Sequence, residues 1–194
     1  MGSTPSLDIA LEQLRLRAMR ENYDRLAAEA SSANLSYERY LLALAEQELA
    51  VRELARQRRC IQQAHLPVLK ELADFDWQAL PSLNRARILA LAQGSYIEQA
   101  EPVLLIGNPG LGKTHIATSL ALAGCRQGRR VRFYTAAGLI NDLIQAQSEH
   151  RLARALATML NYQLLVVDEL GFLPLSQTGA HLLFQFCSSI HERV

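Results

Sequence analysis

The sequence is poor in cysteine and carries no excess of either charge. Its three cysteines, Cys60, Cys125 and Cys187, lie far apart and lack the spacing of metal ligands. Dispersed cysteines in odd number, without a signal-peptide pattern, favour reduced thiols and a cytoplasmic location. The five histidines form no cluster either, so we expect no structural metal site.

Long apolar runs are also missing. None reaches the roughly 18 residues that typically mark a membrane span, so we expect no membrane-embedded segment. With 20 Lys and Arg against 19 Asp and Glu, bulk charge does not favour a nucleic-acid partner. Apolar residues nevertheless make up 49% of the 194 residues, which is enough for a sizeable core.

The most informative stretch is the glycine-rich run 107–114, which reads GNPGLGKT. It follows the apolar run 103–106 and precedes a helix predicted over 116–127, a context typical of a phosphate-binding loop. Glycines let backbone N–H groups approach phosphate oxygens, and the helix N-terminus adds partial positive charge. The pattern predicts that Lys113 binds the β- and γ-phosphates and that the Thr114 hydroxyl binds Mg²⁺. The predicted nucleotide-binding residues are Gly107, Asn108, Pro109, Gly110, Leu111, Gly112, Lys113, Thr114 and His115.

Two of these assignments have plainer alternatives. The glycine run by itself is also compatible with a simple turn between a strand and a helix. His115, next to Thr114, is either a contact near the nucleotide or a half-buried helix residue, which is a common place for histidine.

A second motif lies downstream, where the apolar run 164–167 ends in Asp168 and Glu169. A strand here places Asp168 beside the Mg²⁺ ion. Glu169 then lies where it is able to orient and deprotonate an attacking water, which makes it the candidate catalytic residue.

We divide the chain into a helical region, residues 1–95, and an α/β region, residues 96–194. In the helical region apolar residues recur at helical spacing, and Ser36 is a suitable N-cap for a long second helix. In the α/β region we expect strands at 103–106, 131–135 and 164–169, separated by helices, then a loop at 171–175 and a final helix over 179–191. This order predicts an α/β fold with a parallel sheet and the nucleotide at the carboxyl ends of its strands.

A group of arginines falls on the long second helix. Arg52, Arg56 and Arg59 share one helix face, and Arg58 lies beside them. One interpretation is a stripe that contacts DNA phosphates. The alternative is a solvated face on which Glu48 pairs with Arg52. No recognition-helix signature is present, so any DNA contact is expected at the backbone and not at base edges.

Together these motifs resemble the IstB-like ATP-binding proteins, AAA+ helper ATPases of insertion-sequence transposition that are related to DnaC-type helicase loaders. The resemblance rests on GNPGLGKTHIA (107–117), LLVVDELGFLPL (164–175), GAHLLFQF (179–186), LSYERYLLALAEQELAVRE (35–53), the arginine run and FDW (75–77). It implies an AAA+ P-loop NTPase core, ATP and Mg²⁺ as cofactors, and ATP hydrolysis. It also implies assembly on DNA, contact with a transposase, and a homo-oligomer in full-length relatives.

The sequence departs from the family pattern near its carboxyl end. In that family the core continues with two more strands, a polar sensor residue and an arginine finger, and the next strand inserts between the phosphate-loop strand and the Asp-Glu strand. None of these precedes Val194. We therefore expect an incomplete core, with unpaired backbone and apolar surface in the middle of the sheet, and weak or absent ATP turnover.

Other functions stay open at this point. One alternative is a helicase loader acting in replication, which uses the same ATP chemistry with a different partner. Another is an inactive truncated remnant. A metabolic kinase is disfavoured because Asp168 and Glu169 suit the activation of water.

Overall fold

The computed structural model describes residues 5–172 and 176–191. It divides into two compact units, Met1–Arg56 and Gln57–Val194. This division differs from the boundary expected between residues 95 and 96. Residues 57–95 belong to the α/β unit because their apolar side chains, among them Phe75 and Ile88, pack against Ile116 and Leu120 of the phosphate-loop helix.

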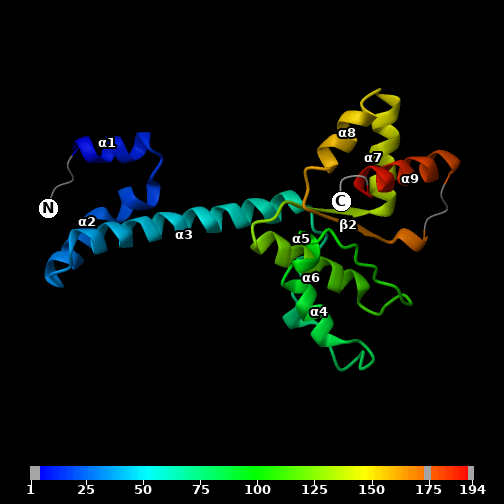
Figure 1. The fold of residues 1–194 in the computed structure, drawn as a ribbon, viewed down its shortest axis with the longest axis horizontal. Coiled ribbons are helices and arrows are strands. Elements are labelled where there is room, and N and C mark those ends of the chain that lie inside the picture. Colours follow the sequence, from blue (N-terminus) through cyan, green and yellow to red (C-terminus); the bar gives the residue numbers. More distant parts are fainter. Residues whose placement is uncertain (1–4, 173–175, 192–194) are drawn as a thin grey trace. The chain divides into compact units, whose positions relative to one another are not determined.

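The first unit consists of helices, drawn in blue to cyan in Figure 1. They are α1 (Pro5–Gln13), α2 (Arg17–Ser32) and the first part of α3 (Tyr37–Ala64). Arg15 and Asn34 take left-handed backbone conformations, with φ of 57° and 50°, just after α1 and α2. Such a residue commonly ends a helix. At the start of α3 the Ser36 hydroxyl accepts the Arg39 N–H at 3.4 Å, as expected of an N-cap.

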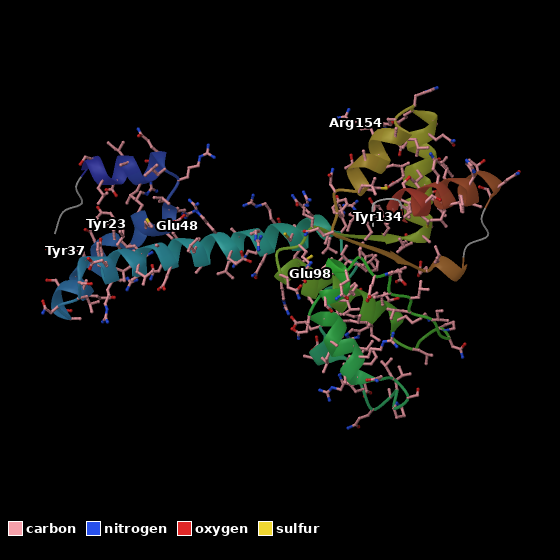
Figure 2. All side chains as sticks on the ribbon, viewed as in Figure 1. Tyr23, Tyr37, Glu48, Glu98, Tyr134 and Arg154 are labelled. Carbon is pink, nitrogen blue, oxygen red and sulfur yellow. The ribbon has the colours of Figure 1, made fainter. Side chains whose placement is uncertain are left out.

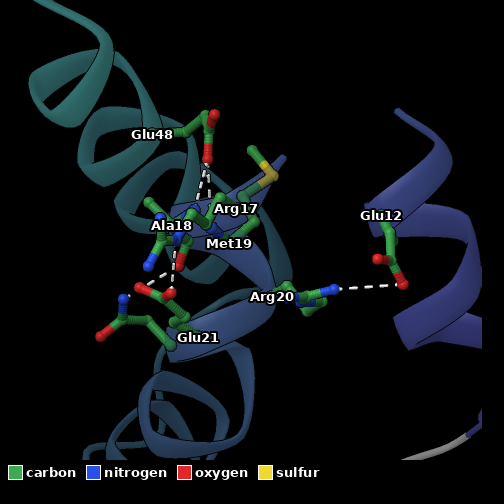
Figure 3. Close-up of polar contacts among 8 residues, drawn as sticks. Glu12, Arg17, Ala18, Met19, Arg20, Glu21 and Glu48 are labelled. Atoms are coloured by element: carbon green, nitrogen blue, oxygen red, sulfur yellow. Dashed lines mark hydrogen bonds and ion pairs between the residues drawn. The ribbon is translucent and has the colours of Figure 1, made fainter. Parts of the chain in front are cut away.

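A buried carboxylate joins two helices of this unit (Figures 2 and 3). Glu48 of α3 is only 5% exposed. Its Oε2 accepts the N–H groups of Ala18 at 2.8 Å and Met19 at 3.3 Å, in the first turn of α2. The N-cap of α2, Leu16, provides no side-chain acceptor. Glu48 therefore satisfies helix N–H groups that would otherwise lack a partner, and it does so from 30 residues away.

The same carboxylate also binds Arg52, whose Nε donates to Oε1 of Glu48 at 2.8 Å. Burial by itself would raise the pKa of Glu48. The hydrogen bonds from Arg52, Met19 and Ala18, with the charge of Arg52, outweigh that effect and lower the pKa. The Glu48–Arg52 ion pair, which was predicted as the alternative to a DNA-binding stripe, is thus present. It helps to hold α3 against the start of α2.

The second unit is a mixed α/β structure. After the end of α3 its elements are the 3₁₀ turn η1 (Leu72–Asp74), α4 (Arg85–Ala92), α5 (Ser95–Glu98), α6 (Lys113–Arg126), β1 (Val131–Thr135), α7 (Ala136–Ser148), α8 (Leu152–Met159), β2 (Leu164–Asp168), the 3₁₀ turn η2 (Leu170–Phe172) and α9 (Gln177–His191). The strands run parallel, with Val131 opposite Leu164 and Thr135 opposite Asp168. The strand predicted over 131–135 is confirmed, and the strand predicted over 164–169 is present but ends one residue earlier, at Asp168.

Helices cover both faces of this sheet (Figure 1). On one face Leu164 and Val166 pack against the cluster that contains Ala121 and Cys125 of α6. On the other face Leu165 and Val167 pack against a cluster formed by α7, α8 and α9. Successive side chains alternate between the faces because a strand has a period of two residues, and helices cover both faces here. The buried members of the second cluster are Leu139, Leu143, Leu156, Met159, Leu182 and Phe186.

The third expected strand is not found. Residues 103–106 have neither helix nor strand structure, and Leu104 and Ile106 are 79% and 90% exposed. Leu105 packs against the cluster that includes Phe75 and Ile116. An extended segment becomes a strand only when a neighbour pairs with its N–H and C=O groups, and the sheet of the described chain contains only β1 and β2. The prediction of three strands is therefore wrong for this structure. Leu104 and Ile106 are exposed apolar side chains, but they lie outside the two-stranded sheet and not in its middle, where unpaired surface was expected.

Two further predictions concern the carboxyl end and the membrane. The helix expected over 179–191 begins two residues earlier, at Gln177. The loop expected over 171–175 includes residues 173–175, which lie outside the described residues. Over the ranges that the structure describes, none of the helices has both the length and the apolar character to span a membrane.

Candidate functional site

The two sequence motifs meet at the carboxyl edge of the sheet. Thr114 lies in the first turn of α6, and Asp168 is the last residue of β2. The Thr114 hydroxyl donates to Oδ2 of Asp168 at 2.7 Å, although 54 residues separate the two in sequence. Hydroxyl and carboxylate oxygens are ligands that Mg²⁺ prefers. These two side chains therefore fit the magnesium ion that the motifs predict.

The phosphate loop precedes α6 and holds the lysine ammonium. Nζ of Lys113 donates to the carbonyl oxygens of Gly107 at 2.8 Å and Asn108 at 2.7 Å. Gly110 and Gly112 have φ of +81° and +77°, a left-handed conformation that glycine adopts without steric cost. Gly112 is also the N-cap of α6 and has no side chain to bind the first N–H groups. Those groups are the ones that bind phosphate in a loop of this type.

Glu169 follows Asp168 at the same edge and is exposed. Its N–H donates to Oδ1 of Asp168 at 2.9 Å, while Oδ2 accepts the Thr114 hydroxyl. Both oxygens of the Asp168 carboxylate are thereby oriented. Glu169 has a φ of +62°, which costs a non-glycine residue roughly 1–2 kcal/mol. Strain of this kind is often found at functional sites, but the catalytic role of Glu169 stays a prediction.

The segment around Phe75 forms the support of the phosphate loop. A Cβ atom placed on Gly112 would lie 2.6 Å from Cε2 of Phe75, so the aromatic ring contacts the loop backbone closely. The Phe75 ring meets the His115 ring edge-on, with centroids 5.2 Å apart. Nε2 of His115 lies 2.8 Å from the carbonyl oxygen of Glu71 and donates to it. These contacts favour the alternative of a half-buried helix residue for His115, and its contact with a nucleotide stays a prediction.

Further contacts hold this supporting segment along α6. The Ser119 hydroxyl donates to the carbonyl oxygen of Lys70 at 3.1 Å, and Arg126 forms an ion pair with Glu71. Trp77 packs on Phe75 with ring centroids 4.8 Å apart. In the sequence, FDW (75–77) is one of the segments that carry the family resemblance. A signal for the support was also present, since two aromatic residues stand close together in a chain with 6% aromatic residues.

The four arginines predicted to contact DNA fall into two classes. Arg52 is bound to Glu48 and also donates to the carbonyl oxygen of Arg15 at 3.0 Å. Arg56 pairs with Glu53 at 3.0 Å. Arg58 and Arg59 are exposed, and the described part of the chain provides no ion-pair partner for either. DNA contact stays a prediction for all four, and the charges of Arg58 and Arg59 are the ones left free for it.

A glycine-rich loop at the start of a helix, facing an acidic residue at the end of a parallel strand, is the arrangement of P-loop nucleoside triphosphatases. The mixed α/β structure with its parallel sheet is consistent with that class. Comparison with known proteins gives the family. Residues 9–194 match the family of IstB-like ATP binding proteins, and the chain belongs to this family.

Individual relatives agree with this assignment. A protein named as an ATP-binding protein of insertion sequence IS5376, from Geobacillus stearothermophilus, is 34% identical over 93% of this chain and 72% of its own length. The corresponding protein of IS21 from Pseudomonas aeruginosa is 32% identical over 96% of this chain and 71% of its own length. One of IS232 from Bacillus thuringiensis subsp. berliner is 31% identical over 99% of this chain and 77% of its own length.

Proposed function

We propose that this chain binds ATP with Mg²⁺ at the phosphate loop and Asp168, and that it is an ATP-dependent DNA-binding helper of transposition. The observation that carries the nucleotide part is the 2.7 Å hydrogen bond between Thr114 and Asp168, which unites two distant motifs at one sheet edge. Membership of the IstB-like family and the insertion-sequence relatives support the transposition part.

Each residue of the site has a definite task in this proposal. Lys113 exchanges the carbonyl oxygens of Gly107 and Asn108 for phosphate oxygens when the nucleotide binds. Thr114 and Asp168 hold the Mg²⁺ ion, which in the bound state offsets the negative charge of the phosphates. Glu169 orients the attacking water molecule and accepts its proton, and we expect ATP turnover through this residue to be weak.

The DNA and protein partners complete the proposal. Arg58 and Arg59 contact phosphates of the DNA backbone, because their charges are exposed and lack ion pairs within the described residues. A transposase is the protein partner, and several copies of the chain assemble on DNA in the cytoplasm. A helicase loader would use the same ATP site, so the identity of the captured partner separates the two functions.

Calorimetric titration of Mg-ATP into the purified chain tests the nucleotide site. We expect Lys113→Ala to weaken binding by at least about ten-fold, since a charge-assisted hydrogen bond to phosphate is lost. The sequence has one other lysine, Lys70, which is exposed, and Lys70→Ala is the matched control. Asp168→Asn should weaken ATP binding in the presence of Mg²⁺ and have little effect in EDTA. Unchanged binding in both variants would reject the site.

A capture experiment tests the partner. Tagged full chain, with Mg-ATP and duplex DNA, is mixed with the transposase of an IS21-type element or with a replicative helicase. The proposal expects retention of the transposase, dependent on ATP and lost with Lys113→Ala. Retention of the helicase alone would favour the loader.

A further inference from the structure

A cavity lies at the opposite edge of the sheet from the phosphate loop. Its volume is about 380 Å³. Its walls are the end of α3, the first residues of β1, and the turn between α8 and β2. Because β1 and β2 run parallel, their amino ends lie together here, and the site of Thr114 and Asp168 lies at their carboxyl ends.

The lining of this cavity is basic and contains no carboxylate. Arg130 and Arg132 both contribute to it; Arg130 lies immediately before β1, and Arg132 is the second residue of that strand. Within the residues that the structure describes, neither arginine forms an ion pair. The polar side chains of Gln63, Asn161 and Tyr162 also line the cavity. Two positive charges and several neutral polar groups therefore face one space.

Arg132 has hydrogen-bonding capacity that its surroundings do not meet. Its Nε is buried and has no hydrogen-bond partner. Nη1 reaches the carbonyl oxygen of Gln63 only at 3.4 Å, and the guanidinium carbon lies 5.1 Å from the centre of the Tyr134 ring. Leaving a buried charged N–H unpaired is costly. A negatively charged hydrogen-bond acceptor beside Arg132 would satisfy this N–H group.

We propose that this cavity binds a phosphate group, carried either by a DNA strand or by a free nucleotide. The planar guanidinium fork matches the oxygens of phosphate, which accepts several hydrogen bonds at once. Arg130 is exposed, so a phosphate on a large molecule reaches the cavity without displacing the fold. The site is separate from the phosphate loop, and the proposal does not depend on ATP binding there.

Arginine substitutions in the full chain test the cavity. Arg130→Gln and Arg132→Gln remove the charge, and Arg154→Gln on α8 is the control, since Arg154 is exposed and does not line the cavity. Figure 2 shows Arg154 away from Tyr134. With a fluorescent 20-base-pair duplex, we expect each cavity variant to weaken binding by about ten-fold. The slope of log K against log salt should fall by about one for each arginine.

The source of the phosphate is distinguished in a Lys113→Ala background, in which the phosphate loop is disabled. Residual ATP binding that Arg130→Gln or Arg132→Gln removes assigns the cavity to a nucleotide. An effect of these variants on duplex binding alone assigns it to the DNA backbone. If both variants leave duplex affinity, salt slope and residual ATP binding at the level of Arg154→Gln, the proposal is overturned.

Cysteine alkylation in the unsubstituted chain tests the same cavity, so its result does not depend on whether the arginine variants fold. Cys60 lines the cavity and is half-buried, whereas Cys187 on α9 is exposed and serves as the internal control. The alkylation rate of each thiol is followed by mass spectrometry with and without saturating duplex DNA or ATP. We expect one of these probes to slow alkylation of Cys60 several-fold and to leave Cys187 unchanged. Equal rates at Cys60 with either probe overturn the proposal.

Discussion

The helical unit and the α/β unit maintain their structures by different interactions. In the α/β unit, residues 57–194, three clusters of buried apolar side chains surround the sheet and α6. In the helical unit, residues 1–56, the buried apolar residues are few and mostly small, and several leucines of α3 remain exposed. A carboxylate buried at a helix start joins the helices there. We infer that hydrogen bonds and ion pairs fix how the helices of the first unit lie against each other. The second unit is stabilised mainly by burial of apolar side chains.

The largest change in the free energy of unfolding is expected when a core side chain of the α/β unit is truncated. Leu143 is fully buried, so Leu143→Ala should lower the free energy of unfolding by about 2–5 kcal/mol. Leu49→Ala in the helical unit removes the same group from an exposed position and should change it by less than about 0.5 kcal/mol. Urea unfolding followed by circular dichroism measures both. Equal losses would show that the two units do not differ in the way described.

Two glycines of the phosphate loop provide a matched test of packing inside the α/β unit. Gly110 and Gly112 both have positive φ, but only Gly112 has the Phe75 ring against it. Gly112→Ala should therefore cost about 2–4 kcal/mol, from backbone strain and overpacking together. Gly110→Ala is the matched control and should cost about 1–2 kcal/mol, from strain alone.

Thermal unfolding and Mg-ATP titration measure the pair of glycine variants. The fluorescence of Trp77, the single tryptophan, reports this unit directly. Adding Phe75→Leu to Gly112→Ala should recover part of the loss, because the ring is the neighbour that the new methyl group meets. Identical losses at the two glycines would mean that Phe75 does not support the loop.

Glu48→Gln tests the polar bonds of the helical unit. The amide keeps one acceptor oxygen but loses the charge that Arg52 and two backbone N–H groups share. We expect a loss of about 1–3 kcal/mol in the local stability of the start of α2. Hydrogen exchange of the Ala18 and Met19 amides measures this opening directly. Glu46→Gln, at an exposed position of the same helix, should leave both amides protected.

The same residue predicts a pH dependence with a definite sign. The folded structure lowers the pKa of Glu48 from its ordinary value of 4.5. Its contribution is therefore complete above pH 4.5 and is lost as the pH falls through the lowered folded-state value. Exchange of the Ala18 amide, corrected for its intrinsic pH dependence, should show this loss in the wild type and not in Glu48→Gln.

The smallest effects on stability are expected at the free arginines of α3. Changing Arg58 and Arg59 together to Gln should alter the free energy of unfolding by less than about 0.5 kcal/mol, since both side chains are exposed. The salt slope of duplex binding should nevertheless fall by about two. Arg52→Gln should show the reverse, a loss of stability through Glu48 and a smaller change in salt slope. An unchanged slope in the double variant would assign DNA contact elsewhere.

The strand predictions show which features of a strand can be predicted from its own residues. Residues 131–135 form a strand with the predicted bounds, and the strand predicted over 164–169 ends at Asp168; the two pair with each other. The equally apolar run 103–106 does not form a strand, because strand structure needs a hydrogen-bonded neighbour. The residues of a segment indicate whether it is suited to burial. They do not indicate whether another strand lies beside it to pair with its N–H and C=O groups.

In the candidate site, too, the local motifs could be predicted from the sequence and the long-range contacts could not. GNPGLGKT and the run ending in Asp168 are local patterns, and their residues lie at the one sheet edge where the motif logic expects them. The Phe75 ring under Gly112 is a contact across 37 positions of the chain that no periodicity predicts. His115 was ambiguous in sequence for the same reason, since its ring binds the backbone of Glu71, 44 residues away.

Local sequence patterns predict the phosphate-loop class, the order of helices and strands from 113 to 168, and the residues that we propose to hold phosphate and Mg²⁺. These follow from spacing along one strand, one loop and one helix, and such short-range geometry is the same in any fold. Three features appear only once the chain is folded: 103–106 stays unpaired, Glu48 caps a helix 30 residues away, and Arg130 and Arg132 line one cavity. Each of these depends on which segments become neighbours, and that is settled by how the whole chain packs.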